Sequence, residues 1–163
     1  MPHPHRSSLH AASYALEDRI PGRKIGQSRG EAWKEAEAQI FRRPQYEHEL
    51  LVPAVAEPLL VWIISGKAQI EERELTGEWT KSEVGSGSFF LTQTNAPYLM
   101  RWQAGPDRPF EVLHLYLGPT LVNRVARSLG LNPSRLSMRA ISGVQDAFIS
   151  GVLTVSSRRL TPC

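Results

Sequence analysis

Beyond its first ten residues, this sequence has two widely separated histidines, the residue type that most often binds metal ions in proteins. His48 and His114 are the histidines beyond the first ten residues, which contain His3, His5 and His10. A catalytic metal ion needs about three protein ligands held close together. Two distant histidines without a paired acidic residue make a poor site of that kind. We therefore predict that the chain holds no metal ion.

The other groups that could take part in a reaction lack partners at the required spacing. Glu71 and Glu72 are neighbours on an expected strand, so their side chains point to opposite faces and cannot act together as general acid and base. The turn 85–87 is followed by neither a lysine nor a helix, which a phosphate-binding loop needs. Cys163, the single cysteine, is the last residue and has no orienting base. From these residues we predict that the chain is not an enzyme and uses no cofactor.

His114 belongs to a segment, 109–117, in which apolar side chains occupy both faces of an expected strand. Phe110, Val112 and Tyr116 share its face. A strand with two apolar faces is covered on both sides. His114 is therefore either a core histidine with one hydrogen-bond partner or a polar anchor in a ligand cavity.

The neighbouring segment, 96–103, places two aromatic side chains and a methionine on one face of an expected strand. This stripe is either plain core or the wall of a mostly apolar pocket. In the pocket interpretation, Ser65 lies at the end of a facing strand. The predicted ligand-binding residues are Ser65, Tyr98, Met100, Trp102, His114 and Tyr116.

Short extended segments separated by turns must position these side chains. They cover 49–54, 58–65, 67–75, 79–84, 88–92, 96–103 and 109–117. Several short strands at near-regular spacing predict a sandwich or small barrel. Gly66 is expected to turn a hairpin between the segments on either side of it. Residues 31–40 suit a helix or a strand equally well.

The chain divides by composition into three parts. Residues 1–30 are rich in proline and glycine and predict a flexible arm, and residues 31–118 form the barrel. Residues 119–163 predict a helical segment with a frayed tail. Its first helix, 120–129, has an apolar face that either caps the barrel or forms a dimer interface. The candidate dimerisation residues are Leu121, Val122, Val125 and Leu129.

Charge and hydropathy limit the partners and the compartment. Nineteen Lys and Arg stand against sixteen Asp and Glu, and the basic residues are scattered, so we expect no DNA-binding surface on this chain. The longest apolar run, 59–64, is too short to span a membrane, and the N-terminus lacks the apolar core of a signal peptide. We expect a cytoplasmic protein without a membrane partner.

Four stretches, in order, resemble the N-terminal sensor domain of AraC-type transcriptional regulators. They read EAWKEAEAQIFRRP, LLVWIISGKAQIEERELTGEW, VGSGSFFLTQTNAPYLMRW and PFEVLHLYLGPTLVNRVARSLG. The last is similar to the family's closing strand and the helix that follows it. The likeness covers about residues 32–129.

The resemblance implies a mainly β, cupin-like barrel (a double-stranded β-helix) with a C-terminal helical segment. It further implies a small-molecule effector bound in the barrel and a homodimer formed by the following helices. The family binds DNA through helix-turn-helix motifs, which this sequence does not contain, so DNA is expected as a partner only through a missing domain. Two alternatives stay open, a stand-alone cupin-like metalloenzyme (an isomerase or oxygenase) and a pure protein-interaction module.

Overall fold

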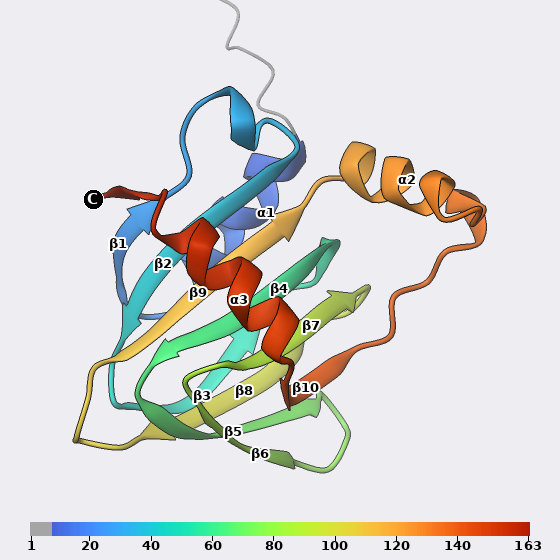
Figure 1. Cartoon of the computed structure of the whole chain (residues 1–163). Coiled ribbons are helices and arrows are strands. Elements are labelled where there is room, and N and C mark those ends of the chain that lie inside the picture. The colour runs from blue at the N-terminus through green and yellow to red at the C-terminus, as the bar shows by residue number, and fades with distance from the viewer. Residues whose placement is uncertain (1–7) are drawn as a thin grey trace, which may run out of the picture.

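Strands that lie far apart in the sequence pair to form two antiparallel sheets that face each other (Figure 1). The computed structural model describes residues 8–163. The larger sheet has the order β10-β7-β4-β9-β2-β1-β11, and the smaller has the order β3-β8-β5-β6. The larger sheet contains β1 (Arg23–Gln27), β2 (Ala36–Arg43), β4 (Val55–Ser65), β7 (Ser88–Thr94), β9 (Phe110–Leu117), β10 (Ile141–Gln145) and β11 (Thr161–Pro162). The smaller contains β3 (Tyr46–Val52), β5 (Lys67–Glu74), β6 (Thr80–Gly85) and β8 (Tyr98–Ala104).

Strand β9 is central, and its pairing explains why its sequence is apolar on both faces. It lies between β2 and β4, with His114 opposite Gln39 on one side and Val61 on the other. One face, with Val112, belongs to the core between the sheets, and the other, with Leu113, belongs to a second core under a helix. The prediction of a strand covered twice is confirmed.

Gly66 marks a passage between the two sheets. Strand β4 pairs with β7 and β9, whereas β5 pairs with β6 and β8. The predicted hairpin is therefore wrong, because the two segments join different sheets. Gly66 has φ of +85°, and a Cβ atom there would lie 2.9 Å from the carbonyl oxygen of Pro109. Both constraints favour glycine at this position.

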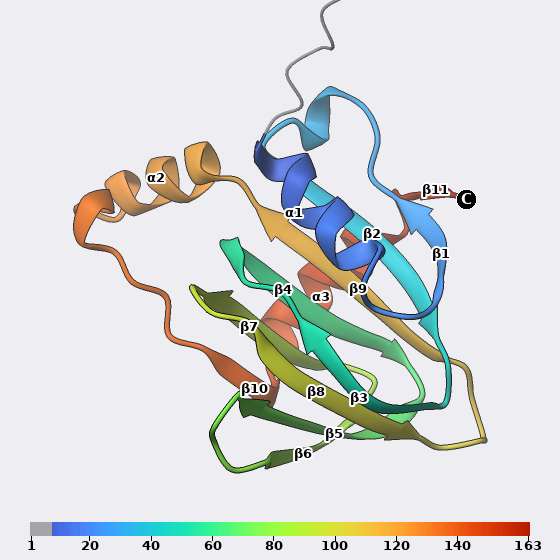
Figure 2. The same ribbon diagram turned by 180° about the vertical axis from the view of Figure 1, so that it is seen from behind.

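The part of the predicted arm that the structure describes is folded onto the barrel. Helix α1 (Ser8–Glu17) is followed by β1, which pairs with β2 and β11. Leu16 is 1% exposed and Ile20 is 6% exposed, and both belong to the core between the sheets. Figure 2 shows α1 beside β2 and β9. The flexible-arm prediction is wrong for residues 8–30, because Pro21, Gly22 and Gly30 lie in connections and Gly26 lies within the paired strand β1. Residues 1–7 lie outside the described part of the chain.

The segment 31–40, which the sequence left open between helix and strand, contains both. A short 3-10 helix, η1 (Glu31–Trp33), precedes β2. Strand β2 pairs with β9 along its full length, from Ala36 opposite Leu117 to Arg43 opposite Phe110. This pairing decides the conformation of a segment whose residues are good helix formers.

The C-terminal part contains the predicted helix and more order than expected. Helix α2 (Pro119–Ser128) projects from the barrel (Figure 1), and a 3-10 turn, η2 (Pro133–Arg135), follows it. Leu121 and Val122 are half-buried, whereas Val125 is 47% exposed and Leu129 is 68% exposed. No helix of residues 8–163 is long and apolar enough to cross a bilayer.

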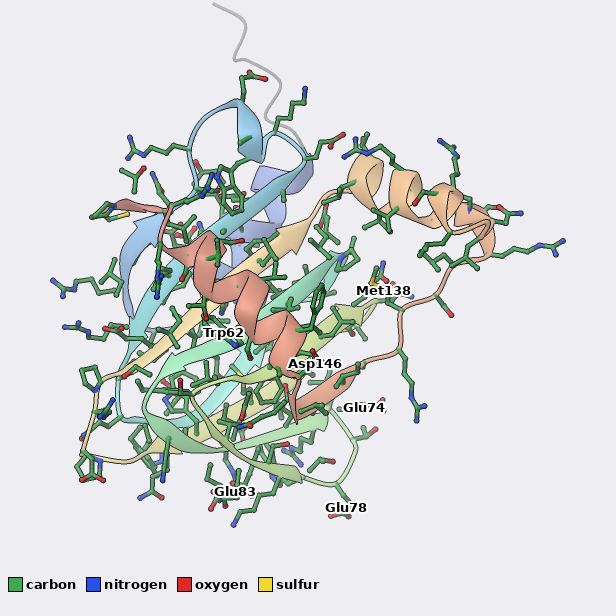
Figure 3. The ribbon with its side chains drawn as sticks, viewed as in Figure 1. Trp62, Glu74, Glu78, Glu83, Met138 and Asp146 are labelled. Carbon is green, nitrogen blue, oxygen red and sulfur yellow. The ribbon has the colours of Figure 1, made fainter. Side chains whose placement is uncertain are left out.

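Helix α3 (Ala147–Ser157) covers the outer face of the larger sheet, where Trp62 lies beneath it (Figure 3). The Asp146 side chain accepts a hydrogen bond of 2.9 Å from the Ile149 amide and so caps the helix. Leu153 packs with Trp62 in the second core, which lies between this helix and the larger sheet. This burial outweighs the weak helix propensity of the β-branched residues. Because β11 then pairs with β1, the frayed-tail prediction is wrong.

Candidate functional site

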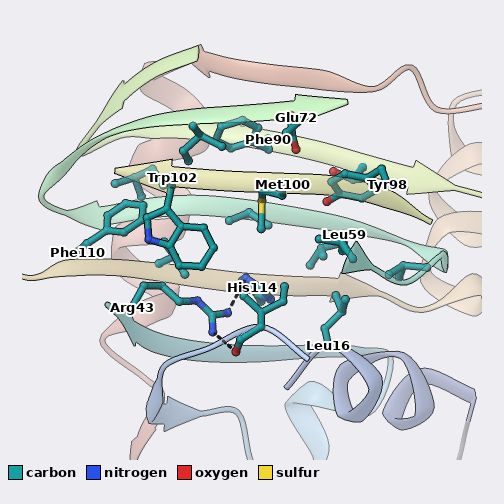
Figure 4. Close-up of a pocket in the computed structure, with 18 residues that line it drawn as sticks. Leu16, Arg43, Leu59, Glu72, Phe90, Tyr98, Met100, Trp102, Phe110 and His114 are labelled. Carbon is teal, nitrogen blue, oxygen red and sulfur yellow. Dashed lines mark hydrogen bonds between the residues drawn. The ribbon is translucent and has the colours of Figure 1, made fainter. Parts of the chain in front are cut away.

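The space between the two sheets contains a cavity whose lining is mainly apolar (Figure 4). Side chains from both sheets line it, and Leu16 and Ile20 close it from the side of α1. It leaves about 60 Å³ for the centres of water molecules. One water needs roughly 10–15 Å³ on this measure, so a few waters fit without any movement of side chains. Three ionisable groups, Arg43, Glu72 and His114, are the charged or basic members of the lining.

Four of the six residues predicted to bind a ligand line this cavity. Tyr98, Met100 and Trp102 come from one face of β8, and His114 comes from β9. The alternation of side chains along each strand brings them together, as the sequence pattern predicted. Whether they bind a ligand stays a prediction.

Tyr116 and Ser65 do not line the cavity. Tyr116 is fully buried, and its hydroxyl lies 3.4 Å from Nδ1 of His114. Ser65 ends β4 opposite Glu111 and lines a separate surface hollow together with Gly66. The prediction that Ser65 lies in the pocket is therefore wrong. The strand runs out of the barrel interior before it reaches this residue.

Arg43 lines the cavity, and sequence reasoning missed it. It is 6% exposed, and its Nη1 donates hydrogen bonds of 2.9 Å to the carbonyl oxygens of Ile20 and Pro21. Its Nη2 lies 3.3 Å from Nε2 of His114. Burial lowers the pKa of Arg43 to about 10. An arginine is normally assigned to the surface, and the signal that could have placed it inside is the alternation with buried Phe41 along β2.

The contact with Arg43 fixes the state of His114. Burial, and then the charge of Arg43, hold the pKa of His114 well below its usual value, so the imidazole is neutral. A guanidinium group only donates hydrogen bonds, so Nε2 accepts and the ring proton sits on Nδ1. Nδ1 then donates to Tyr116, at 3.4 Å. His114 is thus a hydrogen-bonded core histidine that also lines the cavity, and its contact with a ligand stays a prediction.

Glu72 is a second lining residue that the sequence did not indicate. It comes from β5 in the smaller sheet, across the cavity from Arg43 in the larger sheet (Figure 4). Burial raises the pKa of Glu72, and a hydrogen bond of 3.3 Å from the Ser142 hydroxyl opposes the rise. Burial also raises the pKa of Tyr98, followed by the effect of the Glu72 charge. The smaller-sheet wall therefore disfavours negative charge.

Comparison with solved structures identifies the architecture. An apo variant of ToxT from Vibrio cholerae strain SCE256 matches with a TM-score of 0.60 at 12% identity, over 77% of this chain and 48% of ToxT. ToxT from Vibrio cholerae O395 bound to (E)-4-(8-methylnaphthalen-1-yl)but-3-enoic acid matches with a TM-score of 0.55 at 13% identity, over 77% and 48%. The chain shares the fold of the matched part of ToxT, which is mainly β with two facing antiparallel sheets. The predicted fold class is confirmed, at identities that establish the fold alone.

The chain spans about half the length of the ToxT chains that it matches. No family model and no curated protein matches its sequence. Within residues 8–163, no three His, Cys, Asp or Glu side chains are grouped closely enough to hold a metal ion.

The prediction that the chain is not an enzyme is corrected. Oxalate decarboxylase from Bacillus subtilis is among the similar structures, with a TM-score of 0.43 at 14% identity, over 81% of this chain and 42% of the enzyme. Because one fold can carry many unrelated functions, the architecture of this chain gives no ground for excluding catalysis.

Proposed function

We propose that this chain is the effector-sensing part of an AraC-type transcriptional regulator of the cytoplasm, and that it binds a small molecule between its two sheets. The observation that carries the proposal is the cavity, which has apolar walls and a few directed polar groups. The ToxT structure with a bound naphthyl-butenoic acid supports it, because that protein shares the fold and takes a small organic ligand.

DNA binding, in this proposal, belongs to helix-turn-helix motifs outside these 163 residues. Several arginines of the chain are already engaged with carboxylates of the same chain. Arg42 pairs with Glu111 at 2.7 Å, and Arg101 pairs with Glu71 at 2.7 Å. Such pairing leaves less positive charge available for phosphate groups.

Thermal unfolding in the presence of a compound panel tests effector binding. The panel contains straight-chain acids and alcohols of about six to ten carbons, and aryl-substituted butanoic acids. A compound at 100 times its Kd stabilises the folded state by about 2.7 kcal/mol, which raises the Tm of a chain of this size by roughly 5–10 °C. We expect at least one such compound. A panel in which no compound raises the Tm would contradict the proposal.

We further propose that two copies associate through the exposed apolar face of α2. Arg124 of α2 donates to Glu35 at 2.7 Å and so ties the helix to the start of β2, while Val125 and Leu129 face solvent. A helix tied to the barrel by an ion pair, with an apolar face outward, suits a two-fold contact with a second copy.

Mass in solution checks this association. We expect the unmodified chain to have twice its mass of 18.2 kDa, and Val125→Asp to have the mass of one chain. A carboxylate in the middle of an apolar contact must be desolvated, which explains the expected loss. Val144→Asp, at an apolar residue of β10 that is 44% exposed, is the control and should keep the mass of the unmodified chain. A dimer that survives Val125→Asp would place the interface elsewhere.

A further inference from the structure

We propose that Arg43 binds the carboxylate of the effector, and that the effector is an organic acid whose apolar body fills the cavity. This inference rests on the proposed effector function and names the chemical class of the ligand. It depends on three observations: a buried charge without a counter-ion, unused hydrogen-bond donors beside the cavity, and a lining that is otherwise apolar.

The charge of Arg43 is not neutralised within the described part of the chain. Among residues 8–163, no carboxylate forms an ion pair with it, although five other basic side chains pair with acids at 3.4 Å or less. Glu17 is close enough to affect Arg43 electrostatically, but it pairs with Lys24 at 2.8 Å and accepts from Gln39 at 3.2 Å. Burying a cation without a counter-ion is costly, and an anionic ligand would remove much of that cost.

The guanidinium group is held in place and keeps donors available. Two bonds to the carbonyl oxygens of Ile20 and Pro21 and one contact with His114 use three of its five N–H groups. It also stacks on Phe41, 4.2 Å from the ring centroid. Two N–H donors are therefore left on a planar group whose orientation is already fixed. Arginine binds carboxylates through paired N–H donors of this kind.

The surroundings favour a single negative charge attached to an apolar body. Leu59, Ile63 and Phe90 are among the side chains that line the rest of the cavity, and no lysine lines it. Glu72 lies on the opposite wall, where burial raises its pKa and so disfavours its negative charge. The same surroundings disfavour a second negative charge on the ligand. His114 is neutral and adds no positive charge. One cation therefore matches a monocarboxylate better than a phosphate ester with two charges.

The inference is tested by calorimetric titration of the full chain at pH 7.5. The ligands are hexanoate, octanoate and decanoate, and each is compared with its methyl ester. The ester keeps the apolar body and removes the charge. We expect the best acid to bind at least about 10-fold more tightly than its ester, since a hydrogen bond to a charged group contributes that much. In Arg43→Gln, the acid should bind about 10- to 100-fold more weakly, and its affinity should approach that of the ester.

Arg42→Gln is the matched control, because Arg42 is the preceding residue of β2, its side chain is 46% exposed, and it pairs with Glu111. It should bind the acid as the unmodified chain does. Should Arg43→Gln not fold, the ratio of acid to ester affinity in the unmodified chain decides alone. An ester that binds as tightly as its acid would overturn the inference, as would acids that fail while another panel compound binds. If no compound of either set binds, the proposed effector function itself is wrong.

Discussion

Replacing Leu16 by alanine is expected to lower the free energy of unfolding by about 3 kcal/mol, within the range found for buried leucines. Leu16 is 1% exposed and belongs to the core between the sheets. Alanine is the better helix former, so the loss would come from packing and from the space left behind rather than from the helix itself. Urea unfolding followed by circular dichroism measures the change.

Leu75→Ala is the control for this prediction, because it makes the same chemical change in a turn where the side chain is 51% exposed. We expect a change within about 0.5 kcal/mol at that position, in the range of surface substitutions. An equally small effect at Leu16 would mean that α1 detaches from the barrel in solution. The outcome also bears on the site, since Leu16 lines the cavity and its removal would enlarge it.

The strands of the barrel were predictable because each carries its own pattern. In β8, Tyr98, Met100 and Trp102 alternate with other residues, and this period of two is enough to place them on one face. The register between strands is not a local property. Strand β2 pairs with β1 and with the distant β9, and nothing within residues 36–43 indicates those partners.

The same distinction explains which site residues were found and which were missed. His114 and its apolar neighbours form a recognisable stripe, whereas Arg43 and Glu72 are charged residues that local sequence assigns to solvent. Their burial results from pairing with strands far along the chain and, for Arg43, from the carbonyl groups that follow α1. Helix α1 contributes Leu16 and the partly buried Ala12 to the core between the sheets, and so short an apolar pattern does not distinguish the helix from a flexible arm.

Replacing Met100 by tryptophan is expected to block the cavity and to weaken binding of any effector by at least about 100-fold. Met100 lines the cavity from the middle of β8, opposite Leu50 of β3 and Glu72 of β5. The cavity leaves only about 60 Å³ for water centres, so an indole at this position would occupy the space that a ligand needs. Displacing a large side chain from a packed core costs about 3 kcal/mol, which corresponds to the expected loss of affinity.

Leu99→Trp separates blockage from general damage to the strand. Leu99 is the preceding residue of β8, and its side chain points to the opposite face of the sheet, away from the cavity. Calorimetric titration with the best panel compound measures the effect. Leu99→Trp should bind the compound as tightly as the unmodified chain does, and Met100→Trp should give little or no heat. Both variants should unfold cooperatively, with Met100→Trp destabilised by about 1–3 kcal/mol through overpacking. Undiminished binding by a folded Met100→Trp would contradict the placement of the ligand in this cavity.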